Sequence, residues 1–152
     1  MNIVQCNEEH LDILSVLFNE YRMFYEQASD PEACRAFLTT NLAEHRSKLF
    51  LLQDEAGRAV AFAQLYPAVC SLAMRPYHYL SDLFVVPSDR KRGCARFLMN
   101  HLTARFTEEG SERLTLDTAS TNSRARSLYE SLGYERETVY ITYHQRLRSE
   151  AV

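Results

Sequence analysis

The chain has 152 residues, enough for one domain that buries about two-thirds of the surface of its unfolded form. Hydrophobic residues make up 46% and charged residues 24%, with only 4 Gly and 4 Pro, so we expect a folded protein without a long disordered arm. The formal net charge of −3 argues against a protein that coats nucleic acid, so any anion site must be local. No signal peptide and no membrane helix are evident, and we expect a cytoplasmic protein.

The cysteines and histidines give no metal-binding or disulfide pattern. The four cysteines are widely and irregularly spaced, without a C-x-x-C pair, so we expect free thiols. The five histidines include no H-x-x-x-H pair that would place two ligands on one helix face. We therefore predict no metal site.

The first third of the chain predicts one strand and two helices. Residues 2–6 have the pattern of a short strand, and apolar residues then recur at steps of three and four from Leu11 to about Glu26. Asp30-Pro31 indicates a new helix, because Asp can cap the first N–H groups and Pro fits the first helical position. The apolar positions are Leu14, Phe18, Tyr21 and Tyr25 in the first helix, and Cys34, Phe37, Leu38 and Leu42 in the second.

A hairpin and a buried strand follow. Residues 48–54 and 59–66 are apolar and extended, with a turn between them, and Pro67 is expected to end the hairpin. A less regular connection then leads to residues 79–86, a largely buried strand stopped by Pro87.

The last third predicts two helices and three extended segments. One helix runs from about Cys94 to Gly110, and a second is capped by Asn122 and ends at Gly133. Residues 114–117 form a short strand between these helices, and residues 134–147 form a closing extended region rich in β-branched and aromatic residues. No repeat or linker interrupts the chain, so we predict a single domain over residues 1–152.

The loop between the buried strand and the third helix has the features of an anion site. It contains Arg90, Lys91, Arg92 and Gly93, and Arg96 follows in the first helical turn. Cations at a helix start oppose the helix dipole by about 0.3–1 kcal/mol each, an arrangement that makes sense if a bound phosphate completes the site. Alternatively, these are solvated loop charges. Neither a G-x-x-x-x-G-K-[ST] loop nor a G-x-G-x-x-G fingerprint is present.

This loop resembles motif A of the GNAT superfamily of N-acetyltransferases, Arg/Gln-x-x-Gly-x-Gly/Ala, here Arg90-Lys91-Arg92-Gly93-Cys94-Ala95. The resemblance implies that backbone amides of this loop hold the pyrophosphate of coenzyme A. It also implies that the backbone of the preceding strand pairs with the pantetheine arm, as a further strand would. The implied coenzyme-binding residues are Leu83, Phe84, Val85, Arg90, Lys91, Arg92, Gly93, Cys94, Ala95, Arg96 and Asn122.

A second segment, residues 122–134, is similar to motif B of the same family, N-x-x-A-x-x-L-Y-x-x-L-G-F/Y, at every position named. In the family this tyrosine, here Tyr129, points at the coenzyme sulfur, and the asparagine, here Asn122, lies near the pantetheine. Taken alone, Tyr129 is better interpreted as a core aromatic residue of an amphipathic helix, and motif A in front of it favours the functional interpretation.

The resemblance implies an α/β fold with a central mixed sheet flanked by about four helices. Two neighbouring parallel strands, residues 79–86 and 114–117, are expected to splay apart and to receive the thioester in the opening. It also implies direct transfer of an acetyl group from acetyl-CoA to an amine, without an acyl-enzyme. The best match is loosely a bacterial small-molecule or histone-and-polyamine-like branch.

Direct transfer requires a neutral amine, and Asp82 is the best-placed candidate base by sequence. Neutralising a lysine-like amine at pH 7 costs roughly 4.6 kcal/mol, which a positioned base could lower. Strict alternation puts Leu80, Asp82, Phe84 and Val86 on one face of the strand, so Asp82 is alternatively a structural carboxylate.

Tyr129 is the candidate donor to the leaving thiolate, since a hydrogen bond from its hydroxyl would stabilise the developing charge. Tyr21 and Tyr25 are candidates for the acceptor site, or else they pack against the sheet. Cys94 is expected to serve packing rather than reactivity.

A primary amine of a small molecule is the expected acceptor, with a homodimer possible and neither nucleic acid nor membrane as partner. A non-catalytic acyl-CoA-binding sensor or interaction module is the alternative function. A nucleic-acid patch at the basic loop is a further alternative, which the net charge disfavours.

Overall fold

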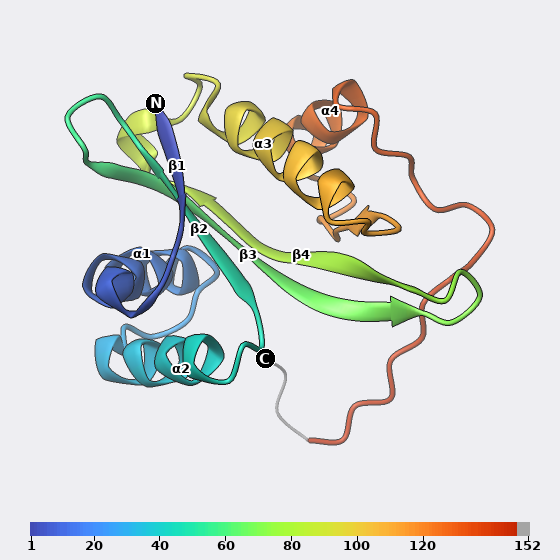
Figure 1. The fold of residues 1–152 in the computed structure, drawn as a ribbon, viewed down its shortest axis with the longest axis horizontal. Coiled ribbons are helices and arrows are strands. Elements are labelled where there is room, and N and C mark those ends of the chain that lie inside the picture. The colour runs from blue at the N-terminus through green and yellow to red at the C-terminus, as the bar shows by residue number, and fades with distance from the viewer. Residues whose placement is uncertain (149–152) are drawn as a thin grey trace. The chain divides into compact units, whose positions relative to one another are not determined.

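The computed structural model describes residues 1–148 and divides into two compact units, Met1–Asp117 and a second that begins at Thr118 (Figure 1). The first unit contains one mixed sheet with the strand order β1-β2-β3-β4-β5, in which only β4 and β5 are parallel. The strands are β1 Asn2–Gln5, β2 Lys48–Gln53, β3 Ala59–Cys70, β4 Arg75–Val85 and β5 Leu114–Thr115. The mixed α/β architecture confirms the predicted fold class.

Helices cover both faces of this sheet. Helices α1 (Leu11–Phe24) and α2 (Pro31–Ala43) lie on one face, and α3 (Cys94–Glu108) lies on the other (Figure 1). The Asp30 side chain accepts a hydrogen bond from the N–H of Ala33 at 3.1 Å, which is the predicted cap of α2. Two short 3-10 helices, η1 Glu8–His10 and η2 Pro87–Asp89, precede α1 and the basic loop.

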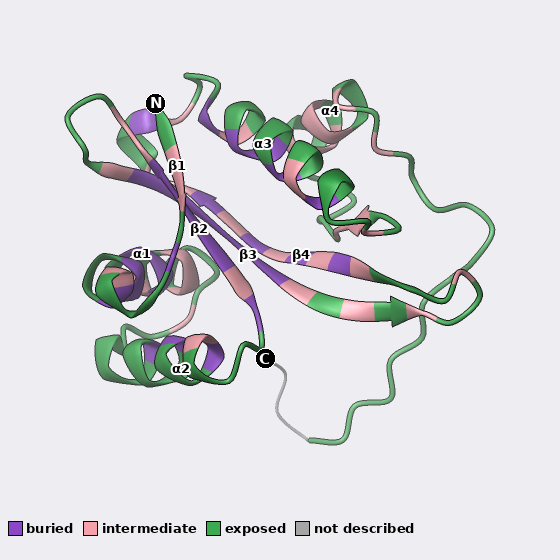
Figure 2. Ribbon diagram, in the orientation of Figure 1, coloured by how far each residue is buried: buried purple, intermediate pink, exposed green. Residues whose placement is uncertain are grey.

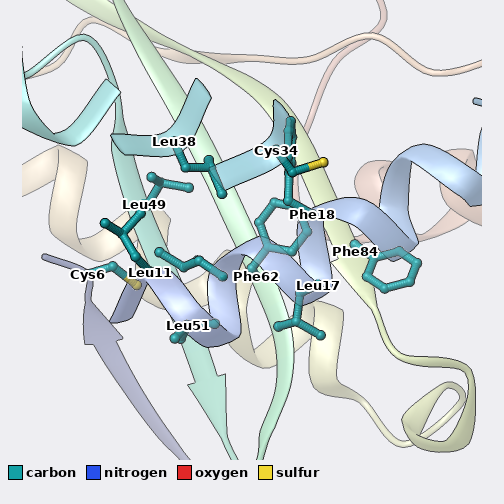
Figure 3. Close-up of a cluster of buried hydrophobic side chains, with 11 residues drawn as sticks. Cys6, Leu11, Leu17, Phe18, Cys34, Leu38, Leu49, Leu51, Phe62 and Phe84 are labelled. Atoms are coloured by element: carbon teal, nitrogen blue, oxygen red, sulfur yellow. The ribbon is translucent and has the colours of Figure 1, made fainter. Parts of the chain in front are cut away.

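The core is concentrated on the central strands, where buried residues cluster in β2, β3 and the middle of β4 (Figure 2). On the α1/α2 side, leucines of both helices pack with the aromatic rings of Phe18, Phe62 and Phe84 (Figure 3). On the α3 side, Phe106 is buried and contacts the ring of Phe50 edge-on, with centroids 6.1 Å apart. The sheet is therefore held between two apolar layers.

The β3–β4 hairpin is longer than the sequence predicted. Strand β3 continues through Pro67 to Cys70, and β4 begins at Arg75 rather than at Tyr79. The prediction failed because Pro67 was assumed to end the strand. Strand β2 pairs with β3 only as far as Leu65, so beyond that point one edge of β3 is free of β2, and a residue without an N–H is tolerated there.

A bulge in β4 changes which residues share a face with Asp82. Asp82 pairs with Gln64, but the next pair is Leu80 with Leu65, so Ser81 is the extra residue of the bulge. Residues directly opposite each other lie on the same face, and Tyr79 pairs with Tyr66. The predicted strict alternation is therefore wrong, since Tyr79 rather than Leu80 lies on the face of Asp82.

Strands β4 and β5 separate after a short parallel contact. The pairing consists of His78 with Leu114 and Tyr79 with Thr115, and β4 then runs on for six more residues to Val85. The short β5 fits the predicted splaying of these two strands. It leaves one edge of β4, from Leu80 onward, without a partner strand among the described residues.

The second unit contains α4 (Ser123–Ser131), with the Asn122 side chain capping the N–H of Ala125 at 3.1 Å as predicted. Residues 135–148 form neither helix nor strand, unlike the extended β-rich region that we expected. The side chains of Val139, Tyr140, Ile141 and Tyr143 are 73–85% exposed. High β-propensity produces a strand only where a partner satisfies the backbone, and in the described chain this segment pairs with none.

None of the described helices is both long enough and apolar enough to cross a membrane. All four cysteines are free thiols, as predicted. The single-domain organisation stays a prediction.

Candidate functional site

The free edge of β4 contains the three residues predicted to pair with the pantetheine arm. Leu83, Phe84 and Val85 pair with β3 on one side only, through Ala63, Phe62 and Ala61. On the other side β5 has already ended, so in the described chain no strand occupies that edge. An extended ligand with amide groups can hydrogen-bond to such an edge as an additional strand.

The basic loop follows β4 after the short helix η2, and its backbone contains two left-handed residues. Lys91 has a φ of 63° and Gly93 a φ of 79°, both in the left-handed region that a non-glycine residue rarely adopts. Gly93 is the N-cap of α3, but without a side chain it caps no N–H, and the first turn carries no acidic residue. The first N–H groups of α3 are therefore left for a ligand or solvent.

The cations of this loop do not play equal roles. Lys91, Arg92 and Arg96 are exposed beside the start of α3. The Nε of Arg90 instead donates to the carbonyl oxygen of Val85 at 2.9 Å, and its guanidinium lies 5.0 Å from the ring centroid of Phe24. Arg90 thus connects the loop to α1, and Arg92 lies 3.5 Å from the Asp89 carboxylate.

An ion pair between the exposed Arg58 and the buried Asp89 lies just before the basic loop. Asp89 is only 4% exposed and accepts two hydrogen bonds from Nη2 of Arg58, at 3.0 Å and 2.9 Å. The Ser88 hydroxyl, with Arg58 in support, holds the pKa of Asp89 below its ordinary value. Arg58 also donates to Asp54 at 3.2 Å, so the β2–β3 turn is tied to the residue just before the basic loop.

Cys94 and Ala95 begin α3 as predicted. Cys94 is buried, and burial raises the pKa of its thiol, which agrees with a packing role rather than reactivity. Ala95, with a single methyl group, leaves the first turn open to a ligand.

Asp82 lies on the α1/α2 face of β4 in a buried polar cluster. Its Oδ2 accepts a hydrogen bond from Nε2 of Gln64 at 2.8 Å. The Oε1 of Gln64 in turn accepts from Asn41 at 2.9 Å and from the Ser47 hydroxyl at 2.7 Å. Burial raises the pKa of Asp82, an effect that hydrogen bonds from Gln64 and Tyr21 reduce. A buried carboxylate with a raised pKa is better suited to accept a proton near neutral pH than an exposed one.

Three tyrosines surround this carboxylate. Tyr21 extends from α1, and its hydroxyl lies 3.5 Å from the carbonyl oxygen of Ser81. Burial and the Asp82 charge both raise the pKa of Tyr21, and burial raises that of Tyr66. Tyr79 donates to Asp117 at 2.6 Å and has a pKa of about 12, raised first by burial. All three are therefore neutral hydrogen-bonding groups at neutral pH.

Of the two predicted acceptor residues, Tyr21 reaches Asp82, while Tyr25 is exposed and packs edge-on against Tyr21 with ring centroids 5.1 Å apart. In the second unit, Tyr129 is partly buried on α4, with its ring 5.9 Å from that of Tyr134. The position of Tyr129 relative to the loop of the first unit stays a prediction, as does that of Asn122.

The family model for acetyltransferases of the GNAT family matches residues 11–134. This range includes the basic loop and both motifs, so the chain belongs to the GNAT acetyltransferase family, whose members use acetyl-CoA as the acetyl donor.

Individual relatives agree with this assignment. The uncharacterized N-acetyltransferase YhfO of Bacillus subtilis (strain 168) is 41% identical over 143 residues, which cover 94% of this chain and 95% of the relative. A crystal structure of a probable acetyltransferase, 34% identical, covers 99% of this chain and all of its own, with a TM-score of 0.93. An aminoglycoside N(6′)-acetyltransferase type 1 of Salmonella typhimurium (strain LT2) is 28% identical, covering 96% of this chain and 99% of its own. The chain is an N-acetyltransferase.

Sequence reasoning missed the residues that support the site from behind. Gln64 is a polar residue within an apolar run, a pattern that signals a buried hydrogen-bonded group, and it could have been singled out. Arg58 and Asp89 carried no such signal, because an ion pair between two loops 31 residues apart depends on the fold. In the described residues, no three His, Cys, Asp or Glu side chains gather in a way that could hold a metal ion.

We predict that Arg58→Met weakens acetyl-CoA binding about tenfold. It leaves Asp89 with Arg92 as its remaining cationic partner, at 3.5 Å, and so draws Arg92 away from the predicted anion site. The Arg58→Met/Asp89→Asn double variant should recover much of the affinity. Isothermal titration of acetyl-CoA measures both, with Arg35→Met, which breaks a surface ion pair with Asp12, as the control. Equal losses in the single and double variants would show that charge compensation is not the role of Arg58.

We predict that Asp82→Asn raises the melting temperature at pH 8. The folded-state pKa of Asp82 lies above its unfolded value, so stability is lost as the pH rises through the interval between them, and the neutral amide avoids this loss. The difference from wild type should shrink as the pH falls towards 4. The exposed Asp12→Asn is the control for melting curves across this range. A wild type more stable than Asp82→Asn at pH 8 would contradict the prediction.

Proposed function

We propose that this protein transfers the acetyl group of acetyl-CoA to the primary amine of a small molecule, by direct attack while both substrates are bound. One observation carries the proposal. The unpartnered edge of β4 leads directly into an uncapped helix start with three exposed cations, and the same strand presents a buried carboxylate on its α1/α2 face. These features suit an extended phosphate-bearing thioester at the edge and an amine near the carboxylate.

In the proposed reaction the amine nitrogen forms a bond to the acetyl carbon, and the bond from that carbon to the coenzyme sulfur breaks. The products are an amide and coenzyme A. The nitrogen gives up two protons on becoming the amide. The first passes from the ammonium to Asp82, directly or through water. The second is lost after the attack and replaces the proton that Tyr129 donates to the departing thiolate, so that coenzyme A leaves as the thiol. No covalent acyl-enzyme is needed, because both substrates bind together.

Asp82 contributes by accepting the ammonium proton. Neutralising a free lysine-like amine at pH 7 costs roughly 4.6 kcal/mol, and a nearby carboxylate with a raised pKa reduces that cost. Gln64 keeps the carboxylate oriented, because its carbonyl oxygen is already occupied by Asn41 and Ser47 and its N–H groups point at Asp82. The raised pKa predicts a loss of rate at acidic pH, when Asp82 is protonated.

A small acceptor suits the enclosed position of Asp82, which is 9% exposed. One full-length relative is named as an aminoglycoside acetyltransferase, which supports a small-molecule acceptor for the wider group. A non-catalytic acyl-CoA sensor would not need a buried carboxylate that is oriented by a hydrogen-bond network on the strand proposed to bind the coenzyme. An enzyme is therefore the better proposal.

The first test is isothermal titration with acetyl-CoA. We expect saturable one-to-one binding that is lost in Arg92→Glu/Gly93→Glu, because acidic side chains would repel the pyrophosphate and a Cβ at the left-handed Gly93 would strain the loop. Arg46→Glu/Thr40→Glu makes the same change in charge at exposed positions in α2 and just after it, and should bind normally. Absence of binding by the wild-type protein at sub-millimolar coenzyme would refute the proposed function.

We predict that Tyr129→Phe keeps acetyl-CoA affinity within about twofold and loses at least tenfold in turnover, since only the hydroxyl is removed. Thiol release measured with a responsive amine gives the turnover, and titration gives the affinity. Tyr140→Phe, an exposed tyrosine of the same unit, is the control. Unchanged turnover in Tyr129→Phe would exclude the thiolate-donor role.

A further inference from the structure

Four aromatic residues are in mutual contact between the carboxylate of Asp82 and the basic loop. We call this group the aromatic shelf, and its members are Tyr21, Phe24, Tyr25 and the buried Phe84. Tyr21 and Tyr25 meet edge-on at 5.1 Å, and Tyr25 and Phe24 meet edge-on at 5.2 Å. Phe84 lies behind them, 6.1 Å from Tyr21 and 6.4 Å from Phe24. The shelf therefore extends from the residue that contacts Asp82 to the end of α1.

The outer part of the shelf is open to solvent. Phe24 and Tyr25 are each 58% exposed. Phe24 is the last residue of the amphipathic α1, whose other face is buried in the core, and Tyr25 is its C-cap. These two large rings lie side by side at the end of a helix, near the carboxylate of Asp82 that is proposed to accept the proton of the amine. They are a suitable surface for a flat apolar group.

The two ends of the shelf carry opposite charges. Asp82 lies at the inner end, where an ammonium group would be attracted to its carboxylate. At the outer end the Arg90 guanidinium already lies over Phe24 at 5.0 Å and over Phe84 at 5.5 Å. A second positive charge on the acceptor would approach Arg90 and be repelled, whereas an uncharged ring would not.

Resting on the proposed function, we propose that the acceptor is a monoamine with an aromatic body, its ammonium directed at Asp82 and its ring packed on Phe24 and Tyr25. Polycationic amines such as polyamines and aminoglycosides fit this arrangement less well. The inference concerns only the acceptor, so it can fail while acetyl-CoA binding and transfer to another amine remain intact.

The test compares thiol release from acetyl-CoA with 2-phenylethylamine, tyramine, spermidine and tobramycin. We expect kcat/KM at least tenfold higher for the two aromatic monoamines. A polycation as the best substrate, or no turnover with either aromatic monoamine, overturns the inference. If acetyl-CoA itself does not bind, the proposed function fails first, and the inference fails with it.

Variants then test the shelf itself. Phe24→Leu and Tyr25→Ser should each raise KM for the aromatic amine about tenfold, with kcat within about twofold, and Tyr25→Ser should leave acetyl-CoA affinity unchanged. Phe37→Leu is the matched control, because Phe37 is an exposed aromatic residue of α2 outside the shelf. Unchanged KM in both shelf variants overturns the inference. Sedimentation provides a further test. A dimer detected in wild type but not in Tyr25→Ser would also overturn the inference, because the exposed rings would then form a contact between two copies of the chain.

Discussion

The site depends on the point at which β4 and β5 part. Two residue pairs join these parallel strands. Strand β4 then continues for six residues to Val85, paired with β3 on one side and with no described strand on the other. In the middle of a sheet, the backbone N–H and C=O groups on both edges of a strand are hydrogen-bonded to neighbouring strands. From Leu80 onward, the groups on one edge of β4 need another partner. The basic loop and the uncapped start of α3 follow directly at the end of that edge. In the proposed function, this one interruption of the sheet serves both the extended amide-bearing part of the coenzyme and its phosphates.

The bulge at Ser81 matters as much as the free edge. By shifting the alternation of β4, it puts Tyr79 and Asp82 on the same face, together with Gln64 and Tyr66 of β3. Without the shift, apolar Leu80 would occupy the position next to Asp82. A carboxylate in this environment costs stability at neutral pH, because burial disfavours its charged form. This cost in stability is consistent with the proposed role of Asp82 as the base.

The sequence predicted the parts of the site that are local in the chain. The basic loop, Gly93 as the start of α3 and the Asn122 cap all follow from residues within a few positions of one another. The aromatic helix α1 was also predicted, although it ends two residues early, at Phe24. What failed involves pairing between distant residues. The course of β3 through Pro67 depends on where β2 ends, the bulge depends on register, and the ion pair of Arg58 with Asp89 joins separate loops. Local patterns contain no record of these contacts.

Arg90 occupies the junction between the two halves of the candidate site. Its backbone opens the basic loop, its Nε donates to Val85 at the end of the free edge, and its guanidinium stacks on Phe24 of α1. A loop cation committed to these contacts is poorly placed to serve as a simple phosphate ligand. Its position instead connects the basic loop to the end of α1 through the ring of Phe24. With both substrates bound as proposed, this one side chain would lie between the donor and acceptor halves of the site and could couple them.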